Sequence, residues 1–133
     1  MKTILIVDDN ARLRALLREW LSAEFPDHLV LEAASGEEAV SRAGSALPSL
    51  AVMDIGLPGM SGIETAGILI ARDPDLRVVM LSIHEEERYR REAAAAGAHA
   101  YVPKRLLQDQ LLPAVRELLM EERTTFQGAD SNT

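Results

Sequence analysis

The chain has 133 residues, of which 47% are hydrophobic, a composition typical of one globular domain and too apolar for a disordered segment. Its formal net charge of −7 argues against a nucleic-acid-binding surface, because phosphate recognition needs clustered lysine and arginine. The absence of cysteine excludes disulfides and thiolate sites, and no apolar run approaches the roughly 20 residues that cross a membrane, so we expect a cytoplasmic protein.

The first half of the chain alternates between the apolar pattern of a strand and that of an amphipathic helix. In chain order it predicts a strand at about 3–7, a helix at about 10–25, a strand at about 29–33, a helix between Ser35 and Pro48, and a strand at 51–53. Ser35 is the expected N-cap of the second helix, because Glu38 follows at the spacing of a capping box. A glycine- and proline-rich loop, 56–62, then leads into a third helix that ends at about residue 72.

The second half continues the alternation. It predicts a strand at about 77–81, a helix at about 85–96, a strand at about 100–102 and a helix at about 108–122. Gly97 stands where a left-handed helix cap is expected, and Pro113 fits the last helix if Asp109 caps it. Residues 124–133 are polar and without a period, so we expect a tail or linker after a domain of residues 1–123. Five such alternations are typical of a doubly wound α/β domain.

Functional side chains follow four of the predicted strands. Asp8 and Asp9 come after the first strand, Asp54 after the third, Ser82 after the fourth and Lys104 just after the fifth. Ligands of open α/β sheets bind beyond the carboxyl ends of the strands. If these strands are neighbours, three carboxylates, a hydroxyl and an ammonium group converge at one edge of the sheet.

Three carboxylates at one site favour a bound cation. Two carboxylates about 4 Å apart repel by about 4 kcal/mol at an effective dielectric constant of about 20, and a third makes an empty site more costly. A hard divalent cation relieves this repulsion, and Mg²⁺ suits a site of a few carboxylates, a carbonyl and waters.

The chain resembles the receiver domains of two-component response regulators, the CheY-like family. The resemblance covers about residues 1–123, and the stretch from Ser82 to Tyr101 is most similar to the NarL/FixJ branch, whose members usually carry a C-terminal helix-turn-helix of the LuxR type. It implies a flavodoxin-like (βα)5 fold with a five-stranded parallel sheet in the order 2-1-3-4-5. The motifs that carry it are Val7-Asp8-Asp9, the run from Asp54 to Gly62, Leu81-Ser82, Ala96-Gly97-Ala98 and Tyr101-Val102-Pro103-Lys104.

The resemblance also implies a phosphorylation site. Asp54 is then the nucleophile that accepts a phosphoryl group from a sensor histidine kinase, and the chain catalyses its own phosphorylation and dephosphorylation without being a conventional enzyme. Asp9 binds Mg²⁺ directly, Asp8 does so directly or through water, and Asp54 and the Gly56 carbonyl complete the protein ligands.

Three further residues have roles by resemblance. Lys104 and Ser82 contact the bound phosphoryl group. Tyr101, whose residue type favours a half-buried packing aromatic over a catalytic one, is a rotamer switch that follows Ser82 and has no chemistry of its own. Phosphorylation would reshape the face formed by the fourth helix, fifth strand and fifth helix. Such a change can drive homodimerisation or release a DNA-binding domain that is not present in this chain.

Two positions depart from the family pattern. Arg105 follows Lys104 where most receivers have a proline joined by a cis bond, and here Pro103 precedes the lysine, so the loop conformation is left open. Ile83 stands at a position that usually holds a small residue. We expect its branched side chain to narrow the path by which a phosphoryl group reaches Asp54. His84 lies close to the site, either to modulate dephosphorylation or to serve packing.

Other interpretations remain open. Asp8 and Asp9 can be read as a cap for the first helix. A phosphatase of the haloacid-dehalogenase type also uses a strand-end aspartate, but it requires a second aspartate two residues later, where Asn10 stands here. The chain can also be a stand-alone regulator that acts through protein contacts, or an interaction module independent of phosphorylation.

Overall fold

A computed structural model of the chain describes the backbone of residues 2–131 and the side chains of residues 2–120. Five parallel strands form one sheet in the order β2-β1-β3-β4-β5, which confirms the fold class and strand order expected from the sequence. The strands are β1 (Lys2–Val7), β2 (His28–Ala33), β3 (Leu50–Asp54), β4 (Arg77–Ser82) and β5 (Ala100–Pro103).

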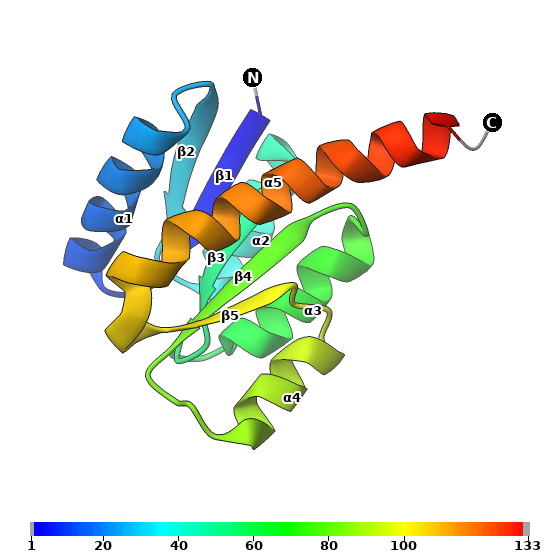
Figure 1. The fold of residues 1–133 in the computed structure, drawn as a ribbon. Coiled ribbons are helices and arrows are strands. Elements are labelled where there is room, and N and C mark those ends of the chain that lie inside the picture. The colour runs from blue at the N-terminus through cyan, green and yellow to red at the C-terminus, as the bar shows by residue number, and fades with distance from the viewer. Residues whose placement is uncertain (1, 132–133) are drawn as a thin grey trace.

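Helices cover both faces of this sheet. They are α1 (Ala11–Glu24), α2 (Gly36–Ala46), α3 (Gly62–Arg72), α4 (Glu87–Ala95) and α5 (Leu107–Ser131), with a short 3₁₀ turn η1 (Lys104–Leu106) before α5. The helices α1 and α5 pack on one face, and α2, α3 and α4 pack on the other (Figure 1). Within the described residues, no helix has both the length and the apolar character needed to cross a membrane.

The sheet is apolar on both faces, which explains why its strands read as continuous apolar runs. Successive side chains of a strand point to opposite faces, so Ile4 and Ile6 of β1 pack against α1 and α5 while Leu5 and Val7 face the other three helices. The same alternation holds in β3 and β4. Each of these central strands is therefore held from two sides, and its carboxyl end is a rigid support for the residues that follow.

Polar caps set the start of three helices. The Asn10 side chain accepts hydrogen bonds from the main-chain N–H groups of Arg12 and Leu13, so Asn10 caps α1 and the alternative that Asp8 and Asp9 do so is wrong. The predicted Ser35 cap of α2 is confirmed. Ser61 caps α3 in the same way, a cap that we did not predict although Glu64 follows it at capping-box spacing.

Two glycines are required by the backbone. A Cβ atom on Gly62 would lie 2.0 Å from the carbonyl oxygen of Asp54, so only glycine lets α3 begin directly against the end of β3. Gly97 has a φ of +105°, the left-handed conformation expected after α4.

The starts of α4 and α5 differ from the predictions. The helix α4 begins at Glu87, two residues later than expected, and the Glu85 side chain, outside the helix, pairs with Arg105. The helix α5 begins at Leu107, because η1 starts the helical winding directly after β5. Asp109 is therefore a first-turn residue and not the cap, and Pro113 lies beyond the first turn.

The helix α5 also extends further than residue 122, where we expected it to end. Its backbone is helical to Ser131, and its last turns project past the body of the domain (Figure 1). The segment contains no proline to break the helix, and Gly128 costs only about 1 kcal/mol relative to alanine. The predicted tail 124–133 is thus mostly helical in its backbone, while Asn132 and Thr133 lie outside the described residues. A linker role for this segment stays a prediction.

Candidate functional site

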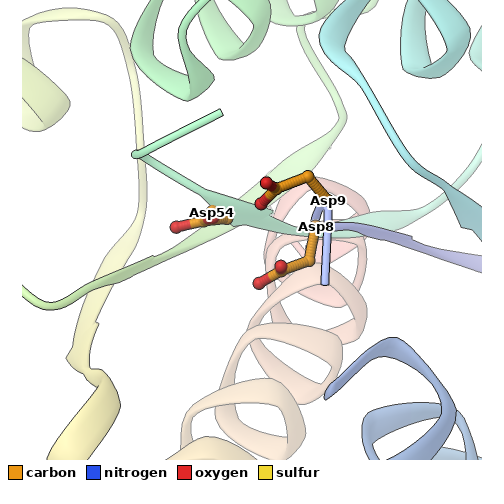
Figure 2. A group of neighbouring side chains, drawn as sticks. All are labelled: Asp8, Asp9 and Asp54. Carbon is orange, nitrogen blue, oxygen red and sulfur yellow. The ribbon is translucent and has the colours of Figure 1, made fainter. Parts of the chain in front are cut away.

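Three carboxylates meet beyond the carboxyl ends of β1 and β3. The strand order places β1 beside β3, so Asp8 and Asp9 lie next to Asp54 although they are far apart in sequence. One carboxylate oxygen from each residue lies within 4.8 Å of the others, and Figure 2 shows the three side chains pointing to the same side. Asp8 and Asp54 are buried, and Asp9 is exposed. This all-oxygen set with one side open to solvent fits a hard divalent cation.

Lys104 brings a positive charge into this cluster. It stands in η1, directly after β5, and its Nζ lies 3.2 Å from Oδ2 of Asp8 and 3.3 Å from Oδ1 of Asp54. Burial alone would lower the pKa of the Lys104 ammonium group, but the carboxylates of Asp54 and Asp8 outweigh it and raise this pKa above its usual range. Lys104 therefore stays protonated between the two buried carboxylates.

The electrostatics of Asp54 are unfavourable for its charged form. Burial raises the pKa of the Asp54 carboxyl group, and the neighbouring Asp8 carboxylate raises it further. Lys104 and a hydrogen bond from the Gly56 N–H lower the pKa but do not cancel the increase. Because its surroundings disfavour its charged form, the Asp54 carboxylate is stabilised by any positive charge added nearby.

The two oxygens of Asp54 have different surroundings. Oδ1 accepts from the Gly56 N–H at 3.1 Å and lies next to Lys104. Within residues 2–120, Oδ2 has no hydrogen-bond or ion-pair partner. One oxygen thus fixes the orientation of the carboxylate, and the other is left as a potential nucleophile. The structure thus shows the Gly56 N–H in contact with Asp54. A metal contact through the Gly56 carbonyl stays a prediction.

Ser82 and Tyr101 both bind the backbone of the same residue, His84. Ser82 is buried at the end of β4, and its Oγ accepts from the His84 N–H at 2.8 Å. The Tyr101 hydroxyl donates to the His84 carbonyl at 2.7 Å, and the Arg90 guanidinium lies 4.6 Å from the centre of its ring. The loop after β4 is therefore tied to the strand ends on both sides.

The same loop carries Ile83 and His84, the two residues predicted to modulate the site. The His84 ring stacks on the Tyr89 ring, with 4.4 Å between ring centres, which favours a packing role for this histidine. The Ile83 side chain, directly after Ser82, is 75% exposed. Whether Ile83 narrows the approach to Asp54 stays a prediction.

Sequence reasoning missed two polar contacts around the site. Arg105 forms two hydrogen bonds of 2.8 Å with the Glu85 carboxylate, joining the loops after β4 and β5. Arg14 in α1 donates to the main-chain carbonyl of Asp8. The sequence shows that Arg105 stands where the family usually has proline, but it does not show that Glu85 is the partner of Arg105. Arg14 lies one turn after the Asn10 cap, which was the available signal for its contact with the strand end. The peptide bonds of the described residues are all trans, including those around Pro103.

The chain matches one protein family model and is similar to regulatory proteins of known name. Residues 4–116 match the family model of the response regulator receiver domain. The chain is 41% identical over 116 residues to the transcriptional activator protein ExaE of Pseudomonas putida, covering 87% of this chain and 54% of that protein. It is 32% identical over 115 residues to the nitrate/nitrite response regulator protein NarL of Escherichia coli, covering 86% of this chain and 53% of that protein.

A solved structure is also similar. It is that of the response regulator protein TrrA from Thermotoga maritima in complex with Mg²⁺ and BeF, with a TM-score of 0.78 and 35% identity. The match covers 89% of this chain and 99% of that chain. By contrast, this chain spans about half the length of the curated relatives that it matches.

Proposed function

This chain belongs to the response regulator receiver domain family, and on that premise we propose that Asp54 accepts a phosphoryl group from a phosphohistidine of a sensor histidine kinase. Membership confirms the resemblance seen in the sequence, including its likeness to NarL-type regulators. One observation carries the assignment of Asp54. Its carboxylate is held through Oδ1 beside Lys104, while Oδ2 has no hydrogen-bond or ion-pair partner among residues 2–120.

The geometry suits an in-line phosphoryl transfer. Oδ2 of Asp54 forms the new bond to phosphorus as the bond from phosphorus to the histidine nitrogen breaks, and that nitrogen keeps the electron pair. Lys104 places its ammonium group where the transferred oxygens carry negative charge, and Ser82 supplies a hydroxyl donor from the neighbouring strand. Ser82 ends β4 and Lys104 directly follows β5, so both side chains are carried by the same edge of the sheet as Asp54.

The acidic cluster supports a requirement for Mg²⁺. Asp8, Asp9, Asp54 and the Gly56 carbonyl are the residues that would hold the ion. When bound, Mg²⁺ supplies positive charge that offsets the charges of the carboxylates and of the phosphoryl oxygens. The complex of the related TrrA protein with Mg²⁺ and BeF is consistent with this chemistry.

Phosphorylation would act through the loop after β4. Ser82 now accepts a hydrogen bond from His84, and Tyr101 holds the carbonyl of the same residue. A turn of the Ser82 hydroxyl towards the phosphoryl group breaks the first contact and frees the loop to move with Tyr101. Shifting such an equilibrium from 1:99 to 99:1 takes about 5.5 kcal/mol, and new contacts to Ser82 and Lys104 supply part of it.

The output of this switch lies in protein contacts. We assign it to the face formed by α4, β5 and α5, where it would promote homodimerisation. Because the relatives are about twice as long and include a transcriptional activator, the domain would control a LuxR-type DNA-binding domain in a longer cytoplasmic protein. Direct binding of DNA by residues 1–133 is not part of this role, since the net charge is −7.

Intact mass spectrometry tests the phosphorylation site. Incubation with Mg²⁺ and acetyl phosphate is expected to add one phosphoryl group to the wild type and none to Asp54→Asn. The matched control is Asp27→Asn, an exposed carboxylate outside the site, which should be labelled like the wild type. In Asp9→Ala, labelling should require more Mg²⁺. Full labelling of Asp54→Asn would refute the assignment.

A further inference from the structure

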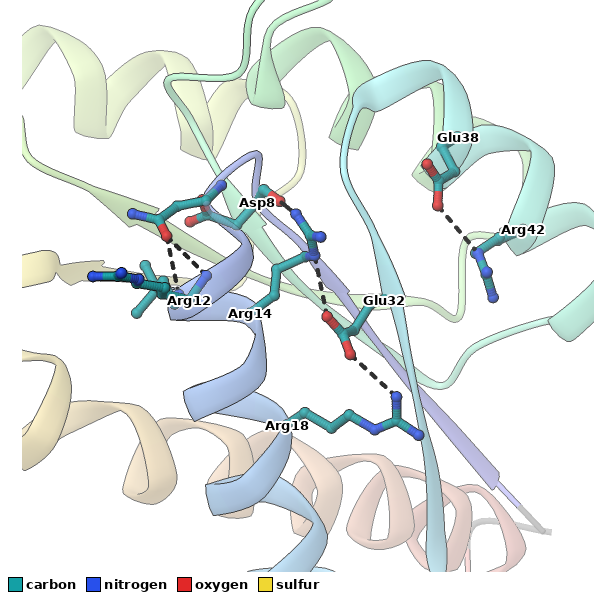
Figure 3. A network of polar contacts seen from close by, with 9 residues as sticks. Asp8, Arg12, Arg14, Arg18, Glu32, Glu38 and Arg42 are labelled. Carbon is teal, nitrogen blue, oxygen red and sulfur yellow. Dashed lines mark hydrogen bonds and ion pairs between the residues drawn. The ribbon is translucent and has the colours of Figure 1, made fainter.

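A basic side chain from α1 holds the segment that carries two of the three clustered carboxylates. The Nη1 of Arg14 donates to the main-chain carbonyl of Asp8, with 2.7 Å between nitrogen and oxygen. Its Nε donates to the Glu32 carboxylate in β2 at 3.1 Å. Figure 3 shows the guanidinium between these two acceptors. Arg14 therefore joins α1, the edge strand β2 and the end of β1.

The hydrogen bond from Arg14 to the Asp8 carbonyl lies at the point where the hydrogen bonds of the sheet end. The strand β1 ends at Val7, and the Asp8 N–H still donates to the Ala33 carbonyl of β2. The Asp8 carbonyl lies beyond this ladder and is bound by Arg14 instead. A peptide unit is planar, so fixing the Asp8 carbonyl also fixes the nitrogen and the Cα atom of Asp9.

Asp9 depends on this backbone support more than its neighbour does. The Asp8 carboxylate is held directly, by the Asn10 N–H at 2.8 Å and by Lys104 at 3.2 Å. Within residues 2–120 the Asp9 side chain has no hydrogen-bond or ion-pair partner. Because its side chain has no such partner, the position of its backbone decides which directions the Asp9 carboxylate can reach.

We infer that Arg14, oriented by Glu32, is a positioning residue for the cation site: it fixes the Asp8-Asp9 peptide so that the Asp9 carboxylate faces Asp54. The inference rests on the proposed Mg²⁺-dependent function. The effect is geometric, because the Glu32 carboxylate offsets the charge of Arg14 at a distance of 3.1 Å. Lysine cannot replace this arrangement, since its single ammonium group lacks the planar fork that spans two acceptors.

The chain contains a matched control for this contact. Arg18 lies one turn further along α1 and donates to the other oxygen of Glu32, also at 3.1 Å (Figure 3). Among residues 2–120, Glu32 is its only hydrogen-bond or ion-pair partner. Arg18→Ala therefore removes an arginine from the same helix and the same ion-pair network while leaving the Asp8 carbonyl bound. Arg14→Lys keeps the charge and most of the aliphatic stem, so it remains informative if Arg14→Ala does not fold.

Titration with Mg²⁺, followed by the NMR amide shifts of residues 8–10, measures the affinity of each variant. We expect the Kd for Mg²⁺ to rise about tenfold in Arg14→Ala and Arg14→Lys, the loss typical of residues that orient metal ligands. Arg18→Ala should stay within about twofold of the wild type. Acetyl phosphate labelling should need more Mg²⁺ in the Arg14 variants but reach the wild-type rate at saturation, which a general loss of structure would not produce.

Other outcomes overturn the inference in distinguishable ways. Wild-type Mg²⁺ affinity in folded Arg14→Lys, or an equal loss of affinity in Arg18→Ala, would contradict the positioning role while leaving the proposed function intact. A wild-type protein whose amides do not respond to Mg²⁺ would refute the proposed function itself, and the inference with it.

Discussion

Replacing Asp54 by asparagine is expected to stabilise the protein when Mg²⁺ is absent. The Asp54 carboxylate lies within 4.8 Å of the Asp8 and Asp9 carboxylates and 3.3 Å from the Lys104 ammonium group. At an effective dielectric constant of about 20, each repulsive pair costs about 3 kcal/mol or more and the attractive pair returns about 5 kcal/mol, with the exposed Asp9 further screened. These contributions nearly cancel. The cost of burying the charge therefore decides whether the ionised Asp54 side chain stabilises or destabilises the folded protein.

Asparagine removes that buried charge and keeps an oxygen for the Gly56 N–H and for Lys104. We therefore expect Asp54→Asn to raise the free energy of unfolding by about 1 to 2 kcal/mol in EDTA at pH 7. Urea denaturation followed by circular dichroism measures this difference. Mg²⁺ at ten times its Kd stabilises the wild type by about 1.4 kcal/mol, so the advantage of the variant should largely disappear.

The same reasoning predicts a pH dependence. The pKa of Asp54 is raised in the folded state, so the folded wild type binds the proton more tightly than the unfolded chain does. The destabilisation is present above the folded pKa and is relieved as the pH falls through it towards the ordinary value of 3.8. The gap between variant and wild type should therefore shrink on acidification. An Asp54→Asn protein less stable than the wild type in EDTA, or a gap that does not change with pH, would refute this electrostatic account.

Three further outcomes are expected. Lys104→Ala leaves the buried Asp8 carboxylate without its cation, so it should lower the free energy of unfolding in EDTA by about 2 kcal/mol and make stability more dependent on Mg²⁺; equal urea midpoints would count against the pairing. Ile83→Ala should speed labelling by acetyl phosphate and leave transfer from a kinase less affected, whereas equal labelling rates would remove the steric argument. Beryllofluoride with Mg²⁺ should shift sedimentation towards a dimer, and an unchanged monomer would argue against dimerisation through α4, β5 and α5.

The sheet and the meeting of the acidic residues were predictable because both depend on short-range patterns. Apolar runs that end in Asp8, Asp54 or Ser82 mark buried parallel strands, and all parallel strands present their carboxyl ends at one edge. The Ser35 cap was predictable for the same reason. The Ser61 cap had an equally clear local signal in Glu64, and we overlooked it.

The rest depends on contacts between distant segments. Glu85, which lies just before α4, binds Arg105, a residue 20 positions away along the chain. Arg14 meets the Asp8 carbonyl only once α1 has packed against the end of β1, and Glu32 reaches it from a different strand. A periodic pattern gives the face on which such a side chain lies but not which main-chain group it will bind.

Because the central strands are buried on both faces, their backbone hydrogen bonds should open much less readily than those of the surrounding loops. Amides of β1, β3 and β4 lie in a sheet with apolar packing on both faces, so their hydrogen exchange should report global unfolding. The segment 83–86 is held by polar contacts from Ser82, Tyr101 and Arg105, and its amides should exchange through local opening at much lower free energy. A phosphoryl group on Asp54 would then change protection in this segment and leave the protection of the sheet unaltered.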